Sequence, residues 1–332
     1  MSENEFMNGS SSLSPSTSVS DPWISRFASS ALQGQSNGPA GSDSIITKVV
    51  ESYGNPSKPI CFNIGNGGAG YTGILKSLTD AYISERQKDF RVGWVPNHSR
   101  HSQIALLANV VQLALTYEPE NEDLAVQEGW CSKVGRVFND HFLLAGPAVD
   151  VDSRSATALL RSIAESGRKT GPGSQSRAYV FLSRGDGSAT FAKENSLFRA
   201  AQVDMSAVVK THPCTPYEAL VQAEKEQAFL LTDRATFLTA KRDHAIPSLR
   251  VHVEGGEQLL NPCSALVRSP TLWKDRRGLT ADDEALAFAR WLCGPLAQSI
   301  VAAYGSDWNL GKPLFTVAAQ DDFVKDDLLA TS

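Results

Sequence analysis

The sequence contains no run of about 18 apolar residues, which is the length that a transmembrane helix needs. It also has no excess of positive charge, because 31 Lys and Arg residues stand against 36 Asp and Glu residues. Nucleic-acid-binding domains usually carry a basic patch that neutralises phosphates. The composition therefore predicts a protein with no membrane segment and no nucleic-acid partner.

Cysteine is scarce and scattered, with five residues and no Cys-x-x-Cys pair. This argues against a disulfide framework and against a metal site, and it favours a reducing compartment. Residues 1–41 are rich in Ser, Gly, Pro and Asn, and they lack the basic and apolar regions of a secretion signal. We therefore expect a disordered leader over residues 1–41, a flexible tail over residues 323–332, and an intracellular, cytoplasmic protein.

Common catalytic motifs are missing as well. The sequence has no G-x-S-x-G, no H-E-x-x-H and no Walker lysine, so hydrolase, zinc-protease and P-loop readings lack their minimal parts. His98 and His101 are three residues apart but have no third ligand nearby, and we interpret them as surface histidines. No catalytic residue and no cofactor is assigned from the sequence alone.

What the sequence does contain is an alternation of strand and helix patterns. With 332 residues we expect two domains or one two-lobed unit. A strand over residues 59–64, a glycine loop and a helix over residues 74–83 predict a parallel sheet with its ligand at the carboxyl ends of the strands. Other expected elements are a lead-in helix, a strand pair or one long crossing strand, and a long helix, over residues 42–53, 134–147 and 282–304.

The glycine loop offers one alternative function. Gly65, Gly67 and Gly70 satisfy G-x-G-x-x-G between a strand and a helix, as the dinucleotide fingerprint requires. The acidic residue that would hold a ribose is missing after the next strand, where Ser99 and Arg100 stand instead. An NADP-dependent reductase is therefore one hypothesis.

Residues 180–198 are the second informative stretch. An apolar run ends at Ser183, a polar loop with Arg184 and Asp186 follows, and a helical pattern then begins. Backbone N–H groups at a helix start and a planar guanidinium suit an anion. The alternative is an ordinary turn in which Ser188 or Thr190 caps the helix and Arg184 pairs with Asp186.

Several phrases resemble the tungstate-binding proteins of ABC importers, and in particular fungal relatives of that family. The resemblance spans roughly residues 58–320 and is carried by residues 137–147, 181–198, 228–238, 259–262, 288–292 and 311–315. It implies an α/β, two-lobed type II periplasmic-binding-protein-like fold with a ligand cleft between the lobes. The implied lobe 1 comprises residues 42–146 plus 258–322, and lobe 2 comprises residues 147–257.

The resemblance also implies site residues. Arg184 corresponds to the family's anion-binding arginine, and Ser188 and Thr190 to the hydroxyls beside it. The hydroxyl-rich loop of the family corresponds to residues 66–72, where glycines replace most hydroxyls. The expected ligand-binding residues are Asn66, Gly67, Gly68, Tyr71, Thr72, Tyr117, Arg184, Ser188 and Thr190.

The function implied is a binding protein, not an enzyme, that grips a small anionic ligand between two lobes. The ligand would be an oxyanion such as tungstate or molybdate, or an organic acid. The alternative is a biosynthetic enzyme on the same scaffold, with a carboxylate substrate and with His212 or Asp186 transferring protons. Asp233 is expected as a helix cap, Arg234 as a lobe-internal ion pair, and Asp140 with His141 as a hinge.

Overall fold

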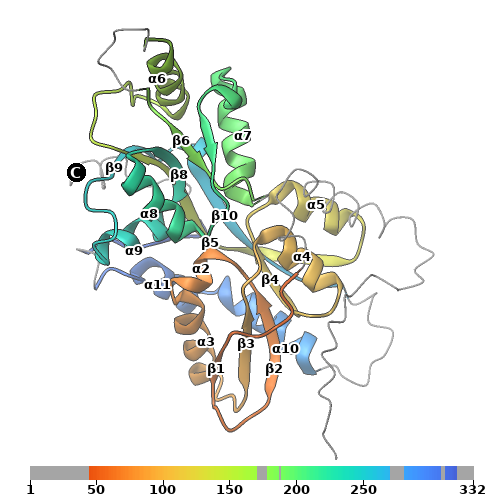
Figure 1. The fold of residues 1–332 in the computed structure, drawn as a ribbon. Coiled ribbons are helices and arrows are strands. Elements are labelled where there is room, and N and C mark those ends of the chain that lie inside the picture. Colours follow the sequence, from red (N-terminus) through yellow and green to blue (C-terminus); the bar gives the residue numbers. More distant parts are fainter. Residues whose placement is uncertain (1–44, 170–177, 187, 270–279, 308–310, 320–332) are drawn as a thin grey trace, which may run out of the picture.

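The computed structural model describes residues 45–169, 178–186, 188–269, 280–307 and 311–319. The expected leader over residues 1–41 and the expected tail over residues 323–332 lie outside these ranges. One mixed sheet runs through the described chain, with its strands in the order β1-β3-β2-β4-β10-β5-β8-β6-β7 and with β9 and β11 pairing with β5. Figure 1 shows that this sheet passes through two lobes, one above the other.

Lobe 1, the lower lobe in Figure 1, is built on three parallel strands that are largely apolar. Such strands are buried on both faces, here by α3, α10 and α4. A short edge strand, β1, runs antiparallel to β3. The elements are β1 (Glu51–Gly54), β2 (Ile60–Gly65), α2 (Gly68–Tyr71), α3 (Ile74–Glu85), β3 (Arg91–Val95), α4 (Ser99–Leu107), β4 (Leu113–Thr116), α5 (Pro119–Gln127), α10 (Thr280–Leu292), α11 (Pro295–Ala303) and β11 (Thr316–Val317).

Lobe 2, the upper lobe, repeats this plan on a smaller scale. Strand β6 lies between β7 and β8 and is parallel to both. Its elements are α6 (Ala156–Lys169), β6 (Phe181–Ser183), α7 (Ala189–Ala201), η1 (Met205–Ala207), β7 (Val209–Thr211), α8 (Pro216–Glu226), β8 (Phe229–Asp233), α9 (Arg234–Arg242), β9 (Arg250–Glu254) and η2 (Glu257–Leu259).

Two long strands connect the lobes. Strand β5 (Cys131–Gly146) pairs with β10 (Leu260–Arg268) along its first part and with β8 and β9 along its last part. Residues 134–146 therefore lie in one continuous crossing strand, the second of the two arrangements expected for residues 134–147, and Pro147 follows its end. The lobe boundaries expected at residues 146 and 258 stay predictions.

The carboxyl ends of the strands in the two lobes face each other. Strand β10 is antiparallel to both β4 and β5, so β4 and β5 run in the same direction. Strand β8 is antiparallel to β5 and therefore runs against β4. Thr116 ends β4 opposite Ser264, whereas Asp233 ends β8 opposite Phe142. The loops that follow these strands consequently converge on the part of β5 where it passes between the lobes.

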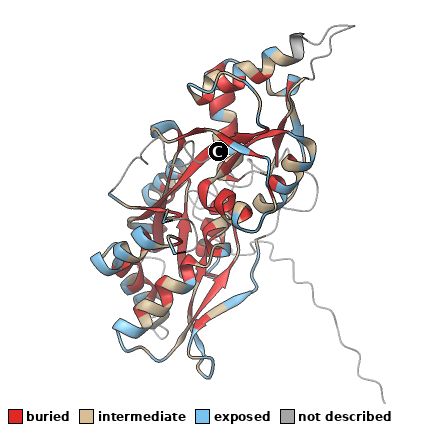
Figure 2. Cartoon of the chain, turned by 90° about the vertical axis from the view of Figure 1, so that its left-hand side faces the viewer, coloured by how far each residue is buried: buried red, intermediate tan, exposed pale blue. Residues whose placement is uncertain are grey.

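The core of lobe 1 is aromatic where α3 and α10 cover β2. Phe288 of α10 lies 5.8 Å from Phe62 of β2 and 4.9 Å from Tyr82 of α3, measured between ring centroids. Such pairs contribute about 0.5–1.5 kcal/mol each beyond the area they bury. Figure 2 shows the result, with buried strands inside and exposed helix faces outside.

The expected lead-in helix over residues 42–53 is wrong. Residues 51–54 form β1, and Tyr53 is buried opposite Val92 of β3. The chain before it is held extended because the side-chain amide of Asn97 donates to the Ile46 carbonyl and accepts from the Ile46 N–H, each at 2.8 Å. A distant side chain thus outweighs a helical spacing of apolar residues.

The single helix expected over residues 282–304 is also wrong. It consists of α10 and α11, which are bent by 62° where Cys293 and Gly294 separate them. Pro295 begins α11, because a proline in a helix interior would remove a hydrogen bond and clash with the preceding turn. Within the described ranges, no single helix is long and apolar enough to cross a membrane, and only this bent pair reaches that length and composition.

A buried carboxyl group supports the loop between β6 and α7. Ser183 at the end of β6 donates its hydroxyl to Glu194, which α7 carries and which is 2% exposed. Burial raises the pKa of Glu194 to about 8, although the Ser183 hydroxyl and Arg184 act in the opposite direction. Glu194 therefore ties the helix to the strand as a neutral acid at neutral pH.

Two glycines of α2 differ in the space around them. A Cβ on Gly70 would lie 2.3 Å from ring carbons of Trp94, whereas a Cβ on Gly68 would have no atom within 4 Å. We expect Gly70→Ala to lower the free energy of unfolding by about 1–3 kcal/mol, because the indole must move. Gly68→Ala is the matched control, and we expect it to be neutral or stabilising by about 0.5–1 kcal/mol. Urea unfolding of both variants measures this, and equal stabilities would contradict the packing described.

Glu194 gives a pH-dependent prediction. Its folded-state pKa lies above the ordinary value of 4.5, so its contribution is present at low pH and is lost as pH rises to about 8. Wild-type stability should fall relative to Glu194→Gln by as much as about 1.4 kcal/mol per pH unit over that window. Urea unfolding at several pH values measures the difference. The exposed Glu165→Gln should keep the wild-type profile, and parallel profiles for wild type and Glu194→Gln would refute the assignment.

Candidate functional site

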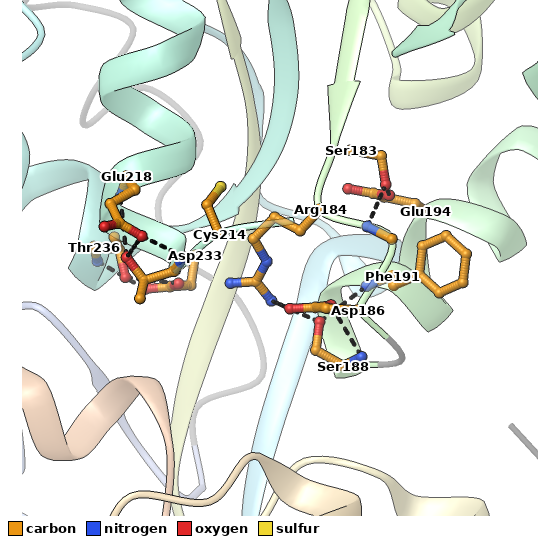
Figure 3. Close-up of polar contacts among 12 residues, drawn as sticks. Ser183, Arg184, Asp186, Ser188, Phe191, Glu194, Cys214, Glu218, Asp233 and Thr236 are labelled. Carbon is orange, nitrogen blue, oxygen red and sulfur yellow. Dashed lines mark hydrogen bonds and ion pairs between the residues drawn. The ribbon is translucent and has the colours of Figure 1, made fainter. Parts of the chain in front are cut away.

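Arg184 is the centre of the candidate site. It follows β6 directly and is only 8% exposed. Its Nη2 donates to the Ser188 hydroxyl at 2.6 Å and lies 2.8 Å from the Asp186 carboxylate. Its Nε is buried and has no hydrogen-bond partner among the residues that the structure describes. Figure 3 shows the guanidinium between these two partners on one side and Cys214 and Asp233 on the other.

The loop that carries Arg184 is closed by short-range hydrogen bonds. The Ser188 N–H donates to Asp186 at 3.1 Å, and the Ser188 hydroxyl accepts from the Phe191 N–H at 3.4 Å as the N-cap of α7. Gly185 has φ +62°, and a Cβ there would lie 2.6 Å from Cγ2 of Thr211. The Arg184–Asp186 pair and the Ser188 cap, expected as the ordinary-turn alternative, are confirmed.

The geometry of this loop fits both an anion-binding site and an ordinary capped turn. Asp186 uses one terminal nitrogen of Arg184 and fixes the guanidinium plane, while the buried Nε keeps a donor without an acceptor. A buried donor of this kind costs about 1–3 kcal/mol unless an acceptor satisfies it. Thr190, the other hydroxyl expected here, is the second residue of α7 and is half-buried.

Asp233 and Arg234 behave as expected. Asp233 caps α9, because its carboxylate accepts from the N–H and the hydroxyl of Thr236 at 2.7 and 2.8 Å. Arg234 is 1% exposed and pairs with Glu254 at 3.3 Å within lobe 2. Asp140 lies beside this cap, where burial and the charge of Asp233 raise its pKa well above the ordinary value. Its role as a hinge stays a prediction.

In lobe 1, Asn66 holds the glycine loop together. Its amide donates to the Leu115 carbonyl at 3.1 Å and accepts from the Gly70 N–H at 2.8 Å. Its own carbonyl accepts from the Trp94 indole at 2.8 Å, and the residue is fully buried. The structure thus gives Asn66 a structural part, and the expected contact with a ligand stays a prediction.

The other expected residues of this loop differ in environment. Gly68 borders open space, whereas Tyr71 is 67% exposed with its ring edge-on to Trp94. Thr72 is turned inward, since its hydroxyl donates to the Ala69 carbonyl and its carbonyl accepts from the Tyr304 hydroxyl. Tyr117 follows β4, its backbone N–H donates to the Ser99 hydroxyl, and burial raises its pKa well above the ordinary value.

The glycine loop does not support the NADP alternative. The dinucleotide fingerprint places one continuous helix after the glycines. Here α2 has four residues, and Gly73 in a left-handed conformation (φ +90°) separates it from α3. Gly67 and Gly70 are instead required by close contacts, since a Cβ on Gly67 would lie 3.3 Å from the Asn97 carbonyl oxygen and from Cα of His98.

The interpretation of His98 and His101 as surface residues is wrong. Their rings stack with centroids 3.9 Å apart, and His101 is 6% exposed. His98 is half-buried and interacts electrostatically with Arg184 and Asp186 of lobe 2. The sequence held one signal for it, because residue 98 lies between a strand end and a helix start, where ligands of parallel sheets bind. Its electrostatic interaction with Arg184 could not be predicted from the sequence, because the two residues are far apart in the chain.

The two residues proposed for proton transfer lie in lobe 2. Asp186 is engaged by Arg184 and Ser188, as described above. His212 follows β7, and its backbone N–H donates to the Ser183 carbonyl at 2.8 Å. Its imidazole is close enough to Glu218 and Glu226 to interact with both electrostatically.

Several known proteins are similar in sequence to this chain. The PBP superfamily domain matches residues 39–295. A protein of Haloferax volcanii described as an ABC transporter anion-binding protein is 30% identical over 253 residues, which are 74% of this chain and 68% of that protein. The tungstate-binding protein TupA of Peptoclostridium acidaminophilum is 28% identical over 198 residues, which are 59% of this chain and 64% of that protein.

A solved structure supports the same fold. The tungstate-binding protein TupA from Desulfovibrio alaskensis G20 is similar with a TM-score of 0.62 at 22% identity, covering 79% of this chain and 100% of that one. The expected two-lobed, periplasmic-binding-protein-like α/β fold is confirmed. The resemblance to the tungstate-binding proteins of ABC importers is confirmed as well, and the chain belongs to the PBP superfamily.

Proposed function

We propose that this protein binds a small oxyanion between its two lobes and that Arg184 is the main anion-binding residue. The observation that carries the proposal is the buried Nε of Arg184, a charged donor without an acceptor. Burying a guanidinium is costly unless its N–H groups are satisfied. An oxyanion offers the planar pair of acceptors that suits a guanidinium edge.

The surroundings of Arg184 support an anion over a neutral ligand. Ser188 caps α7, a helix of 13 residues whose N-terminus carries a partial positive charge. Asp186 and Ser188 hold the guanidinium in place before any ligand arrives, so little side-chain freedom is lost on binding. Lobe 1 would supply backbone groups beside Gly68, where open space adjoins the chain.

The topology supports closure around the ligand. The strand ends of the two lobes face each other, and the lobes are joined by the crossing strands β5 and β10. Two connected lobes of this kind close by a hinge movement about the connecting strands. Closure would bring Tyr117 and the loop after β2 toward Arg184.

The chemical class of the ligand follows from two facts. The relatives are described as an anion-binding protein and as a tungstate-binding protein, which favours a tetrahedral oxyanion such as tungstate or molybdate. The loop after β2, however, contains glycines where the family has hydroxyls, so it contacts a ligand mainly through backbone groups. A panel that includes organic acids therefore belongs in the test.

Arg184→Ala should weaken oxyanion binding by about 30-fold or more, because truncating one partner of a buried charge pair costs about 2–5 kcal/mol. Thermal unfolding with tungstate, molybdate, sulfate, phosphate and citrate measures this. A ligand at 100 times its Kd stabilises the folded state by about 2.7 kcal/mol. The wild type should gain thermal stability with one of the oxyanions, and Arg184→Ala should not.

Arg154→Ala is the matched control. Arg154 also pairs with an aspartate two residues away, Asp152, at 2.7 Å, but its side chain is 88% exposed. This variant should keep the wild-type response. Equal stabilisation of Arg184→Ala and the wild type would refute the site, and stabilisation by citrate alone would change the ligand class to organic acids.

A further inference from the structure

His98 occupies a position in lobe 1 that mirrors that of Arg184 in lobe 2. It follows β3 and is the N-cap residue of α4, a helix of nine residues. Its side chain makes no capping hydrogen bond to the helix. The imidazole therefore does not cap α4, as polar side chains at the N-cap position usually do.

The imidazole is held in place by packing. Its ring stacks on His101, and Cα of His98 approaches Gly67 so closely that a Cβ on Gly67 would lie 3.3 Å away. Its Nδ1 is buried and has no hydrogen-bond partner. A rigid ring with a buried, unsatisfied nitrogen thus borders the glycine loop.

The charged groups that face this ring come from both lobes. His101 and Arg100 lie on α4, while Arg184 and Asp186 approach from the loop after β6, and all four act on His98 electrostatically. Arg184, at 8% exposed, itself has an unsatisfied buried Nε. Among the described residues, His98 and Arg184 thus each have a buried nitrogen without a hydrogen-bond partner, and the two side chains are close enough to interact electrostatically.

We propose that His98 is the residue of lobe 1 that contacts the bound anion, and that its imidazole takes up a proton when the anion binds. This inference rests on the proposed function. A protonated imidazole donates from both nitrogens and adds a positive charge opposite Arg184. It would replace part of the donors lost where the family's hydroxyls have become glycines.

The direction of the pH effect follows from the charges. Burial, together with the charges of His101, Arg184 and Arg100, lowers the pKa of His98 to about 3, although Asp186 acts in the opposite direction. The ring is then neutral at neutral pH. A bound oxyanion favours the charged ring and raises this pKa. Affinity should therefore rise as pH falls, by at most about tenfold per pH unit for one proton.

Proton uptake is measured by titrating the wild type with tungstate and with molybdate in two buffers of different ionisation enthalpy. We expect net proton uptake at pH 6 and binding that is about tenfold tighter at pH 6 than at pH 8. This measurement needs no substitution, so it stands however the variants fold. Anion binding with neither proton uptake nor pH dependence would overturn the role of His98.

His98→Asn is the informative variant, since Asn is a favoured N-cap and preserves the start of α4. At pH 8 we expect its affinity for tungstate or molybdate to lie within about threefold of the wild-type affinity. At pH 6 we expect it to lack the increase in affinity that the wild type shows. The control is His244→Asn, at an exposed position with φ 56° that Asn tolerates. It should keep the wild-type pH dependence.

The outcomes separate the two proposals. Binding that survives in Arg184→Ala, or no binding of either anion by the wild type, overturns the proposed function. Arg184-dependent binding whose pH dependence persists in His98→Asn overturns only the inference about His98. The inference about His98 is also overturned if His98→Asn lowers anion affinity as much at pH 8 as at pH 6, because the contact would then not depend on protonation of the imidazole.

Discussion

The pairing of β5 first with β10 and then with β8 is the constraint on which the rest of this structure depends. It makes one continuous sheet out of two lobes and sets the strands of lobe 2 against those of lobe 1. The loops after β2, β3 and β4 therefore face the loops after β6 and β8. Without this crossing, each lobe would present half of a site to solvent, and the buried guanidinium of Arg184 would have no opposite wall.

Three contacts within lobe 2 support the proposed anion site. Glu194 bonds Ser183 beneath the loop, Ser188 caps α7, and Asp186 orients Arg184. Each contact removes freedom from the guanidinium, whose buried Nε is the donor that we propose for the anion. Lobe 1 contributes close backbone packing and the stacked histidines, because its glycines allow the chain after β3 to approach. The site is thus asymmetric, with the fixed charge in one lobe and a titratable ring in the other.

The accuracy of the sequence-based predictions varied with the range of the interactions involved. The strand expected over residues 59–64, the Ser188 cap, the Asp233 cap and the Arg184–Asp186 pair depend on neighbouring residues, and the structure confirms them. The helix expected over residues 42–53 failed because Asn97, far away in sequence, holds Ile46 extended. Pro295 is a local signal for the start of a new helix. The apolar periodicity over residues 282–304 continues across it and therefore predicts a single helix.

By itself, the sequence determined the α/β class, because strand and helix periodicity are local, and its resemblance to known proteins indicated the family. The anion-binding role of residues 183–190 stays a proposal. Only the tertiary structure decided that His98 lies within electrostatic reach of Arg184. His98 interacts with residues of three separate parts of the chain. Its ring packs on that of His101, its Cα lies close to Gly67, and it interacts electrostatically with Arg184. No local pattern encodes such contacts, since strand order and crossing direction bring the loops together.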